Sequence, residues 1–481
     1  MSQYDQWYPR LSRLRCEIPT GQRSHPARRT TKFDDITSPE NLVAAFRHVR
    51  NYGGSARGPD RIHIDDIAMS DVWDLARAVS PCLQDHSYRP GDTRWIRILK
   101  KPATSVVASS QNATQPHVGP RRYRRIQISR LVDRIVSCAV QQAIGPVIER
   151  ELLGGCYSQG GRGPLLLLAH LDHDIRRTGF GWIVNDDVSS AFDCIPKQYV
   201  VDCHRDLISK PSLMRLLESG IQGPEANSTV GITQGGATSP CFYTWTMHKL
   251  HDLAMARCQT PHWYRFVDNH LYLCRCEATA RSTRRRAQQL LGRQGLTLKF
   301  PQKEAIINLR ERDTELLGYR ISIKAEQLHL TVDEKAWKEL GEKLDQAHNE
   351  PRPLTVAGEI CRGWALAYGP GIVDPADAAL RMMSLLHQHC LGGATSMTEL
   401  LDAFLTGREH WESLRKGDHT PSNERLYEDA GRLRRPPPRA EMACNIQHVR
   451  VICPPGVNPD DVPFDLSGSL PDHVRRDAAG R

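Results

Sequence analysis

Three short segments of the chain combine acidic and glycine-rich residues in a way that suits metal ions and phosphates. The first, 186–193, reads DDVSSAFD and places two acids at the end of an apolar run that begins at Trp182. The second, 231–240, reads GITQGGATSP, and the third, 266–269, reads FVDN between apolar neighbours. A carboxylate flanked by apolar strand residues is costly to bury unless it is paired or binds a metal. These segments therefore carry the candidate chemistry of the chain.

Two strands side by side in one sheet would bring the acids of the first and third segments to one point. Carboxylates that hold two Mg²⁺ ions about 4 Å apart stabilise the attacking and leaving oxygens of a phosphoryl or nucleotidyl transfer. Each segment alone has a plainer explanation, because an aspartate at a strand end is more often a turn or cap residue, and a QGG turn serves any tight loop. The order and spacing of all three predict a two-metal transfer site.

The elements that must position these residues are short strands alternating with helices. We expect helices at 41–49 and 131–153, strands at 95–99, 124–128, 182–188 and 316–323, and a hairpin-like pair at 264–274. This mixture predicts an α+β sheet domain with helices on one face. After Leu330 the pattern turns helical, with a capping box from Thr331 to Glu334 and helices at 360–368 and 378–391.

Length and composition bound the class of protein. The 481 residues are enough for two or three subdomains, and the formal net charge of +9 is a modest excess that suits a polyanionic partner. Residues 1–15 show no signal peptide and no apolar run is long enough to span a bilayer, so we expect a cytoplasmic protein without a membrane partner. The 14 cysteines are scattered without a CxxC pair, which is typical of small core residues in a reducing compartment.

Over roughly residues 35 to 390 the chain resembles the reverse transcriptases of group II introns and their bacterial relatives, which are RNA-directed DNA polymerases. DVSSAFD looks like motif A of that family, GITQGGATSP like motif B, and FVDN stands where YxDD is usual. Further ordered matches are 51–66 to the opening finger motif, 88–90, 98–100, 124–128 and 132–136 to the fingers, 157–163 to the next turn, 295–298 with Lys303 to motif D, 317–319 to motif E, and 362–364 with Tyr368 to the thumb.

The resemblance implies an α+β right-hand polymerase, with fingers and palm built from an antiparallel sheet plus helices and followed by an α-helical thumb. The boundaries that it implies are a flexible basic arm at 1–32, fingers at 33–180, a palm with motifs A to E at 181–330, a maturase-like thumb at 331–406 and a disordered tail at 407–481.

The resemblance also implies a set of catalytic and metal-binding residues. Asp187, rather than the preceding Asp186, and Asp268 would bridge two Mg²⁺ ions, with the backbone carbonyl of Val188 as a further ligand. Asn269 stands where a second aspartate is usual; its amide oxygen can coordinate Mg²⁺ but brings no charge. We therefore expect an active enzyme with an altered metal site, for which Mn²⁺ is a second candidate ion. Lys303 would protonate the departing pyrophosphate.

A second set of residues would bind the nucleotide. Phe192 would lie under the incoming sugar, where its ring leaves no room for a 2′-hydroxyl and favours deoxynucleotides. Gln234 and Gly235 would line the nucleotide and template path. Arg124 and Lys100 would pair with the triphosphate, whose charge suits arginine geometry.

Three functions remain open from the sequence. The first is a polymerase that extends a DNA or RNA primer with dNTPs on an RNA template. The second is a maturase, an RNA-binding splicing factor with little catalysis, which Asn269 and the thumb motif favour but the intact Asp187, Phe192 and Gln234 oppose. The third is an antiphage defence reverse transcriptase that uses a non-coding RNA. The sequence leaves the cognate RNA, the primer and the oligomeric state open.

Overall fold

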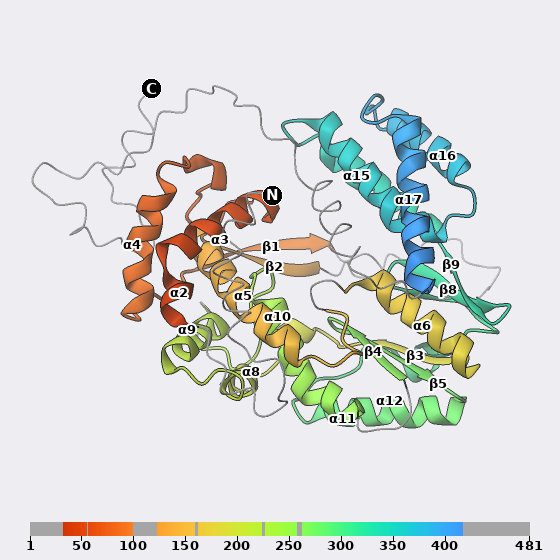
Figure 1. Ribbon diagram of the computed structural model, residues 1–481, viewed down its shortest axis with the longest axis horizontal. Helices are drawn as coiled ribbons and strands as arrows, with labels where there is room; N and C mark the ends of the chain where they lie inside the picture. The colour runs from red at the N-terminus through yellow and green to blue at the C-terminus, as the bar shows by residue number, and fades with distance from the viewer. Residues whose placement is uncertain are drawn as a thin grey trace, which may run out of the picture. The chain divides into compact units, whose positions relative to one another are not determined.

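The computed structural model describes residues 32–54, 56–99, 123–158, 162–223, 227–256 and 262–416. They form two compact units, the first from the described parts of 1–151 and 190–246, the second from those of 152–189 and 247–442. The predicted α+β class is confirmed, because helices and small antiparallel sheets occur together (Figure 1). Nearly all of the predicted basic arm, and the predicted tail beyond Lys416, lie outside the described residues.

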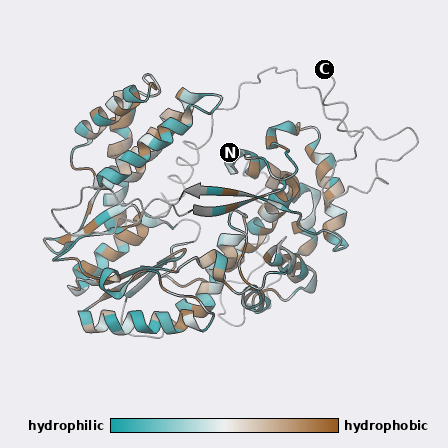
Figure 2. Ribbon diagram, turned by 180° about the vertical axis from the view of Figure 1, so that it is seen from behind, coloured by the Kyte–Doolittle hydropathy of each residue, from teal (hydrophilic) through white to brown (hydrophobic). Residues whose placement is uncertain are grey.

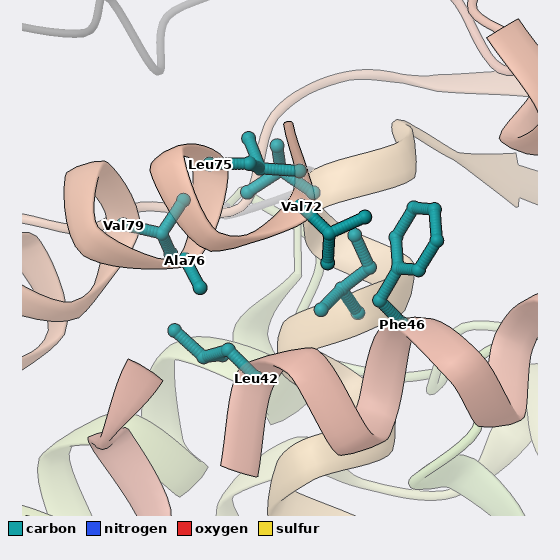
Figure 3. A pocket seen from close by; sticks show the side chains of 8 residues that line it. Leu42, Phe46, Val72, Leu75, Ala76 and Val79 are labelled. Carbon is teal, nitrogen blue, oxygen red and sulfur yellow. The ribbon is translucent and has the colours of Figure 1, made fainter. Parts of the chain in front are cut away.

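The first unit is mostly helical, and its described residues include one two-stranded antiparallel sheet. Its elements are α2 (Phe33–Thr37), α3 (Pro39–Tyr52), the 3-10 turn Ile64–Asp66, α4 (Val72–Gln84), β1 (Thr93–Leu99), β2 (Tyr123–Ser129), α5 (Leu131–Glu151), α7 (Ala191–Cys194), α8 (Lys197–Arg205), α9 (Pro211–Gln222) and most of α10 (Ser239–Met247). Leu42 and Phe46 of α3 face Val72 and Ala76 of α4 (Figure 3). The gap between these helices, about 10 Å³, is apolar and too small for a ligand.

Helix α5 is long and apolar enough to cross a membrane by length and composition alone. However, 56% of its most apolar stretch is buried inside the structure, as in the core helix of a soluble protein. A single helix of this kind is weak evidence for a membrane.

The second unit is built on a four-stranded antiparallel sheet in the order β4–β5–β3–β6. The strands are β3 (Trp182–Asp187), β4 (His262–Phe266), β5 (Asn269–Cys274) and β6 (Ile306–Asn308). Helix α12 (Glu277–Gly292) packs on one face and α6 (Pro164–Thr178) on the other (Figure 1). The prediction of helices on one face only is therefore wrong. Residues 270–274 of β5 are all buried, so both faces of that strand need a cover.

A three-stranded antiparallel sheet follows, from β7 (Thr314–Leu316), β8 (Tyr319–Lys324) and β9 (Gln327–Thr331). The single strand predicted at 316–323 is thus a hairpin. The chain turns at Leu317, with a φ of +51°, and at Gly318, with a φ of +90°. Glycine adopts positive φ without steric cost, so Gly318 suits this tight turn.

After β9 the described residues of the unit form α14 (Glu334–Ala347), α15 (Pro353–Tyr368), α16 (Pro375–Gln388) and α17 (Met397–Lys416), and two short helices, α11 (Leu253–Ala256) and α13 (Gln302–Ala305), lie earlier in the unit. The predicted capping box is corrected, because Asp333 caps α14 by accepting from the backbone N–H of Ala336 at 3.2 Å. Helix α17 continues past the thumb boundary predicted at 406, because Trp411 and Leu414 are buried in the core beside α6.

Candidate active site

The ends of β3 and β5 bring together residues of the first and third segments. In the antiparallel pairing of these strands, Asp187 lies opposite Asn269. Directly opposed residues project from the same face of a sheet, and the preceding Asp186 projects from the other face. Asp268 lies in the turn between β4 and β5, and its carbonyl accepts from the backbone N–H of Val188 at 3.1 Å. The structure therefore places all four predicted metal ligands at one edge of this sheet.

Asp186 has a structural role. It is fully buried, and its carboxylate accepts from the Nε of Arg284 in α12 at 2.9 Å. The backbone N–H groups of Asp187, Lys299 and Phe300 donate to the same carboxylate at 3.0, 3.1 and 3.0 Å. Burial raises the pKa of Asp186, while these hydrogen bonds and Arg284 act to lower it. Asp186 therefore faces helix α12, which packs on one side of the sheet.

The two carboxylate oxygens of Asp187 have different surroundings. Oδ2 accepts from the ammonium of Lys299 at 2.7 Å. Oδ1 is buried and has no hydrogen-bond partner among the described residues. A buried oxygen without a partner is costly, and carboxylate oxygens are the donors that Mg²⁺ prefers. Asp187, Asp268, the amide oxygen of Asn269 and the carbonyl of Val188 thus fit a divalent cation chemically.

Lys299 is a site residue that sequence reasoning missed. The motif D-like stretch pointed to Lys303, which lies exposed on α13 (Gln302–Ala305). It is Lys299 whose ammonium contacts Asp187. The segment around Lys299 runs beside the end of β3, since Leu298 pairs with Val188 in an isolated antiparallel bridge. Only this tertiary pairing selects Lys299, and no local pattern reveals it.

The turn that carries Asp268 is strained. Val267 has a φ of +55°, which β-branched residues rarely adopt. Surrounding groups hold it in place: its N–H donates to the hydroxyl of Ser158, and its carbonyl accepts from Nη1 of Arg265 at 3.2 Å. Strain of this kind persists only where the surrounding structure fixes it, and it is concentrated at functional sites.

A buried ion pair lies next to this turn. Arg265 and Asp252 are both fully buried, and the Nε and Nη2 of Arg265 donate to the Asp252 carboxylate at 2.6–3.1 Å. Asp252 ends the π-helical segment His248–Asp252 and also bonds to the ring of His251 at 2.8 Å. Burial acts to raise the pKa of Asp252, but Arg265 and His251 together hold it below its usual value. Sequence reasoning missed this pair, because its partners lie 13 residues apart on two different elements and no local pattern links them.

The residues predicted to bind the nucleotide belong to the first unit. The ring of Phe192 is half-buried and stacks on Tyr243, with 4.8 Å between ring centroids. The carbonyl of Gln234 accepts from the N–H of Gln127 in β2 at 2.8 Å. Gly235 has a φ of +112°, and a Cβ there would lie 2.6 Å from the Gln127 carbonyl, so a larger residue would force this loop off β2. The structure therefore joins the segment 231–240 to the sheet of β1 and β2.

The two predicted triphosphate ligands are described only in part. Arg124 lies in β2 opposite Ile98 of β1, which fixes its backbone position. Lys100 lies outside the described residues.

In the described part of the chain, no group of three or more His, Cys, Asp and Glu side chains could hold a metal ion. The candidate ligand set has two carboxylates, with an amide and a backbone carbonyl beside them. A scan of the sequence against models of known protein families and a search of curated proteins both found no match. The functional assignment therefore depends on the motifs and on the geometry of this sheet edge.

Proposed function

We propose that the protein is a reverse transcriptase, an RNA-directed DNA polymerase that extends a DNA or RNA primer with dNTPs. The supporting observation is the meeting of Asp187, Asp268 and Asn269 at the ends of β3 and β5, with the Oδ1 of Asp187 buried and unpartnered among the described residues. In this proposal the four-stranded sheet is the core of a right-hand palm, and helices α14–α17 form the thumb.

Each residue of this sheet edge has a distinct task in the proposed reaction. Bound divalent cations would stabilise charge on the transferring phosphate and on the primer 3′-oxygen. Asp187 and Asp268 would hold them through charged oxygens, with Val188 and Asn269 as neutral ligands. The Val188–Asp268 hydrogen bond fixes the spacing between the two acidic segments. Lys303 remains the proposed proton donor to the leaving pyrophosphate.

We expect Phe192, Gln234, Gly235, Arg124 and Lys100 to contact the nucleotide. Stacking on Tyr243 limits the rotation of Phe192, which is what a steric gate against a 2′-hydroxyl requires. The loop of Gln234 and Gly235 is fixed to β2, the strand that also carries Arg124. Lys100 completes the proposed triphosphate contacts.

Primer extension on an RNA template, with dNTPs in Mg²⁺ and in Mn²⁺, tests this function. Asp187→Ala and Asp268→Ala should each reduce extension at least about a hundredfold, since metal ligation contributes several kcal/mol to the transition state. Asn269→Asp should increase it. Asp313→Ala is the matched control, because Asp313 is an exposed acid of the same unit that pairs only at the surface with Arg320.

Two other results would redirect the assignment. Tight RNA binding by an unchanged protein that extends no primer in either metal would favour the maturase function. Extension that appears only with an added co-purifying non-coding RNA would favour the defence function.

A further inference from the structure

Helix α12 is fixed on one face of the four-stranded sheet, so one of its sides always points outward. The Nε of Arg284 donates to the buried carboxylate of Asp186 at 2.9 Å, and Ala287 and Leu291 are fully buried under the helix. Asp187, the next residue of β3, projects from the opposite face of the sheet. The outer side of α12 therefore lies behind the sheet from the Asp187 carboxylate.

Four arginines lie on this outer side. With 3.6 residues per turn, they cover one continuous side of the helix and its C-cap, opposite the buried Ala287 and Leu291. The exposed residues of this region are all small, polar or basic, and they are Ala278, Arg281, Ser282, Arg285, Arg286, Gln289, Gly292 and Arg293. We call Arg281, Arg285, Arg286 and Arg293 the arginine face.

Most of the charge of the arginine face has no acidic partner. The one acid of the helix, Glu277, accepts from the Nε of Arg281 at 2.9 Å. The guanidinium groups of Arg285, Arg286 and Arg293 have no ion pair or hydrogen bond among the described residues. Like charges four residues apart, such as Arg281 and Arg285, destabilise a helix. The fold therefore makes no use of this positive charge, which suits a negatively charged ligand.

The arginine face suits the phosphates of a strand better than a membrane surface. A guanidinium group binds phosphate oxygens through two parallel N–H···O bonds. Arg285 and Arg293 lie about 12 Å apart along the helix axis, so the face can contact several phosphates of one strand. A helix that lies on a membrane needs large apolar side chains beside its basic ones, and the exposed positions of α12 carry none.

We propose that the arginine face of α12 binds the phosphate backbone of a nucleic-acid strand, independently of its sequence and outside the candidate active site. Phosphate contacts position a strand without reading its bases. In the proposed polymerase this strand is RNA that flanks the copied template, and that identity rests on the proposed function. The binding of the strand is measured without any reaction.

Fluorescence anisotropy of a labelled single-stranded RNA of mixed sequence, titrated with the full-length protein at several salt concentrations, tests the proposal. Arg285→Gln/Arg286→Gln/Arg293→Gln should bind about tenfold or more weakly at low salt. The slope of log Kd against log salt concentration should decrease by about 2, because each phosphate contact to a single strand contributes about 0.7. The corresponding triple lysine variant keeps the charge and should retain most of the slope. Both variants should melt as wild type does, since glutamine and lysine are good helix formers.

Arg77→Gln/Arg205→Gln/Arg320→Gln is the matched control, because it removes the same charge from three exposed arginines that pair with acids at the surface. It should bind RNA as wild type does, and equal weakening in both glutamine variants would overturn the proposal. So would unchanged RNA binding by the α12 glutamine variant. If that variant instead loses binding to phosphatidylserine vesicles or to polyglutamate alone, the face serves a membrane or an acidic protein.

Primer extension separates this surface from the proposed function. The α12 glutamine variant should extend a saturating short primer–template at the wild-type rate, because the arginine face lies behind the sheet from Asp187. A wild type that extends no primer, together with weaker RNA binding by the α12 glutamine variant, would retain this surface and overturn the polymerase function alone. Normal extension together with unchanged RNA binding by that variant would overturn the surface alone.

Discussion

At the scale of single residues, Arg265 joins a buried ion pair to the turn that carries Asp268. Its Nε and Nη2 bind Asp252, and its Nη1 reaches the carbonyl of the strained Val267. A lysine keeps the charge but lacks the planar fork that serves both partners at once. In the proposed polymerase, Arg265 is therefore a positioning residue for Asp268, and its effect on catalysis should be separable from its effect on stability.

We expect Arg265→Lys to lower kcat for primer extension at least about tenfold with little change in KM, since misplacing a catalytic group affects the chemical step. Arg265→Met should lower the free energy of unfolding by about 3 kcal/mol or more, because it leaves Asp252 charged and buried without its partner. The double variant Arg265→Met/Asp252→Leu should regain stability but not kcat. Recovery of both would show that Arg265 serves the fold alone.

His204 gives a second prediction at this scale. It is fully buried, its Nδ1 bonds to the Val200 carbonyl at 2.7 Å, and its ring packs edge-on against Phe242. Burial lowers the pKa of His204 to about 4, from its usual value of 6.5. Below pH 6.5 the unfolded chain therefore binds a proton that the folded chain refuses, and stability falls until the pH reaches about 4.

The loss attributable to His204 should reach about 3 kcal/mol across this window. His204→Leu removes the titrating group, so its melting temperature should depend less on pH between 7 and 4 than that of wild type. If the melting temperatures of the two proteins fall by the same amount between pH 7 and pH 4, His204 is not the group responsible for the pH dependence.

At the scale of elements, the sequence predicts strands and helices well where apolar periodicity is strong. The ends of β3 and of the β4–β5 hairpin follow the predicted ranges closely, because apolar runs and acidic ends mark them. The same ranges predicted that Asp187 and Asp268 would meet. The sequence did not predict that helices pack on both faces of β5, since the pattern of a short buried strand does not indicate which helices pack against it. Helix α12 is largely hydrophilic (Figure 2), yet it supplies Arg284 to the buried Asp186.

The attachment of α17 to α6 offers an element-scale prediction. Asp172 of α6 is fully buried and accepts from Nε of Arg415 in α17 at 2.8 Å and from the N–H of Leu328 in β9 at 2.7 Å. Asp172→Ala removes the acceptor of the Leu328 N–H, of Nε of Arg415 and of Nε of Arg176, which donates at 3.1 Å, and should lower the free energy of unfolding by about 3 kcal/mol. Glu412→Ala, which removes only the surface partner of Arg415, should cost less than about 1 kcal/mol. If denaturant titrations give the same loss in free energy of unfolding for both variants, the buried contacts of Asp172 stabilise the fold no more than the surface contact does.

At the scale of the whole molecule, the predicted boundaries and the observed units differ for a physical reason. The chain leaves the first unit after Glu151, returns to it at Ser190, and leaves it again within α10. The segment 186–193 is therefore divided, with Asp187 in the second unit and Phe192 in the first. Linear boundaries drawn from motif order cannot describe such a path, because compact units are defined by contacts between distant segments.

The C-terminal end of the described chain gives a prediction for the full protein. A chain that ends at residue 406, the boundary inferred from the sequence, loses Trp411 and Leu414 from the core beside α6, together with the Arg415–Asp172 ion pair. Burying two large apolar side chains contributes about 2–3 kcal/mol each, so this truncation should lower the melting temperature markedly. A chain that ends at Lys416 keeps all of these contacts and should melt at the same temperature as the 481-residue chain. If the chain that ends at Lys416 also melts at a lower temperature, residues 417–481 stabilise the fold, and the folded unit extends beyond α17.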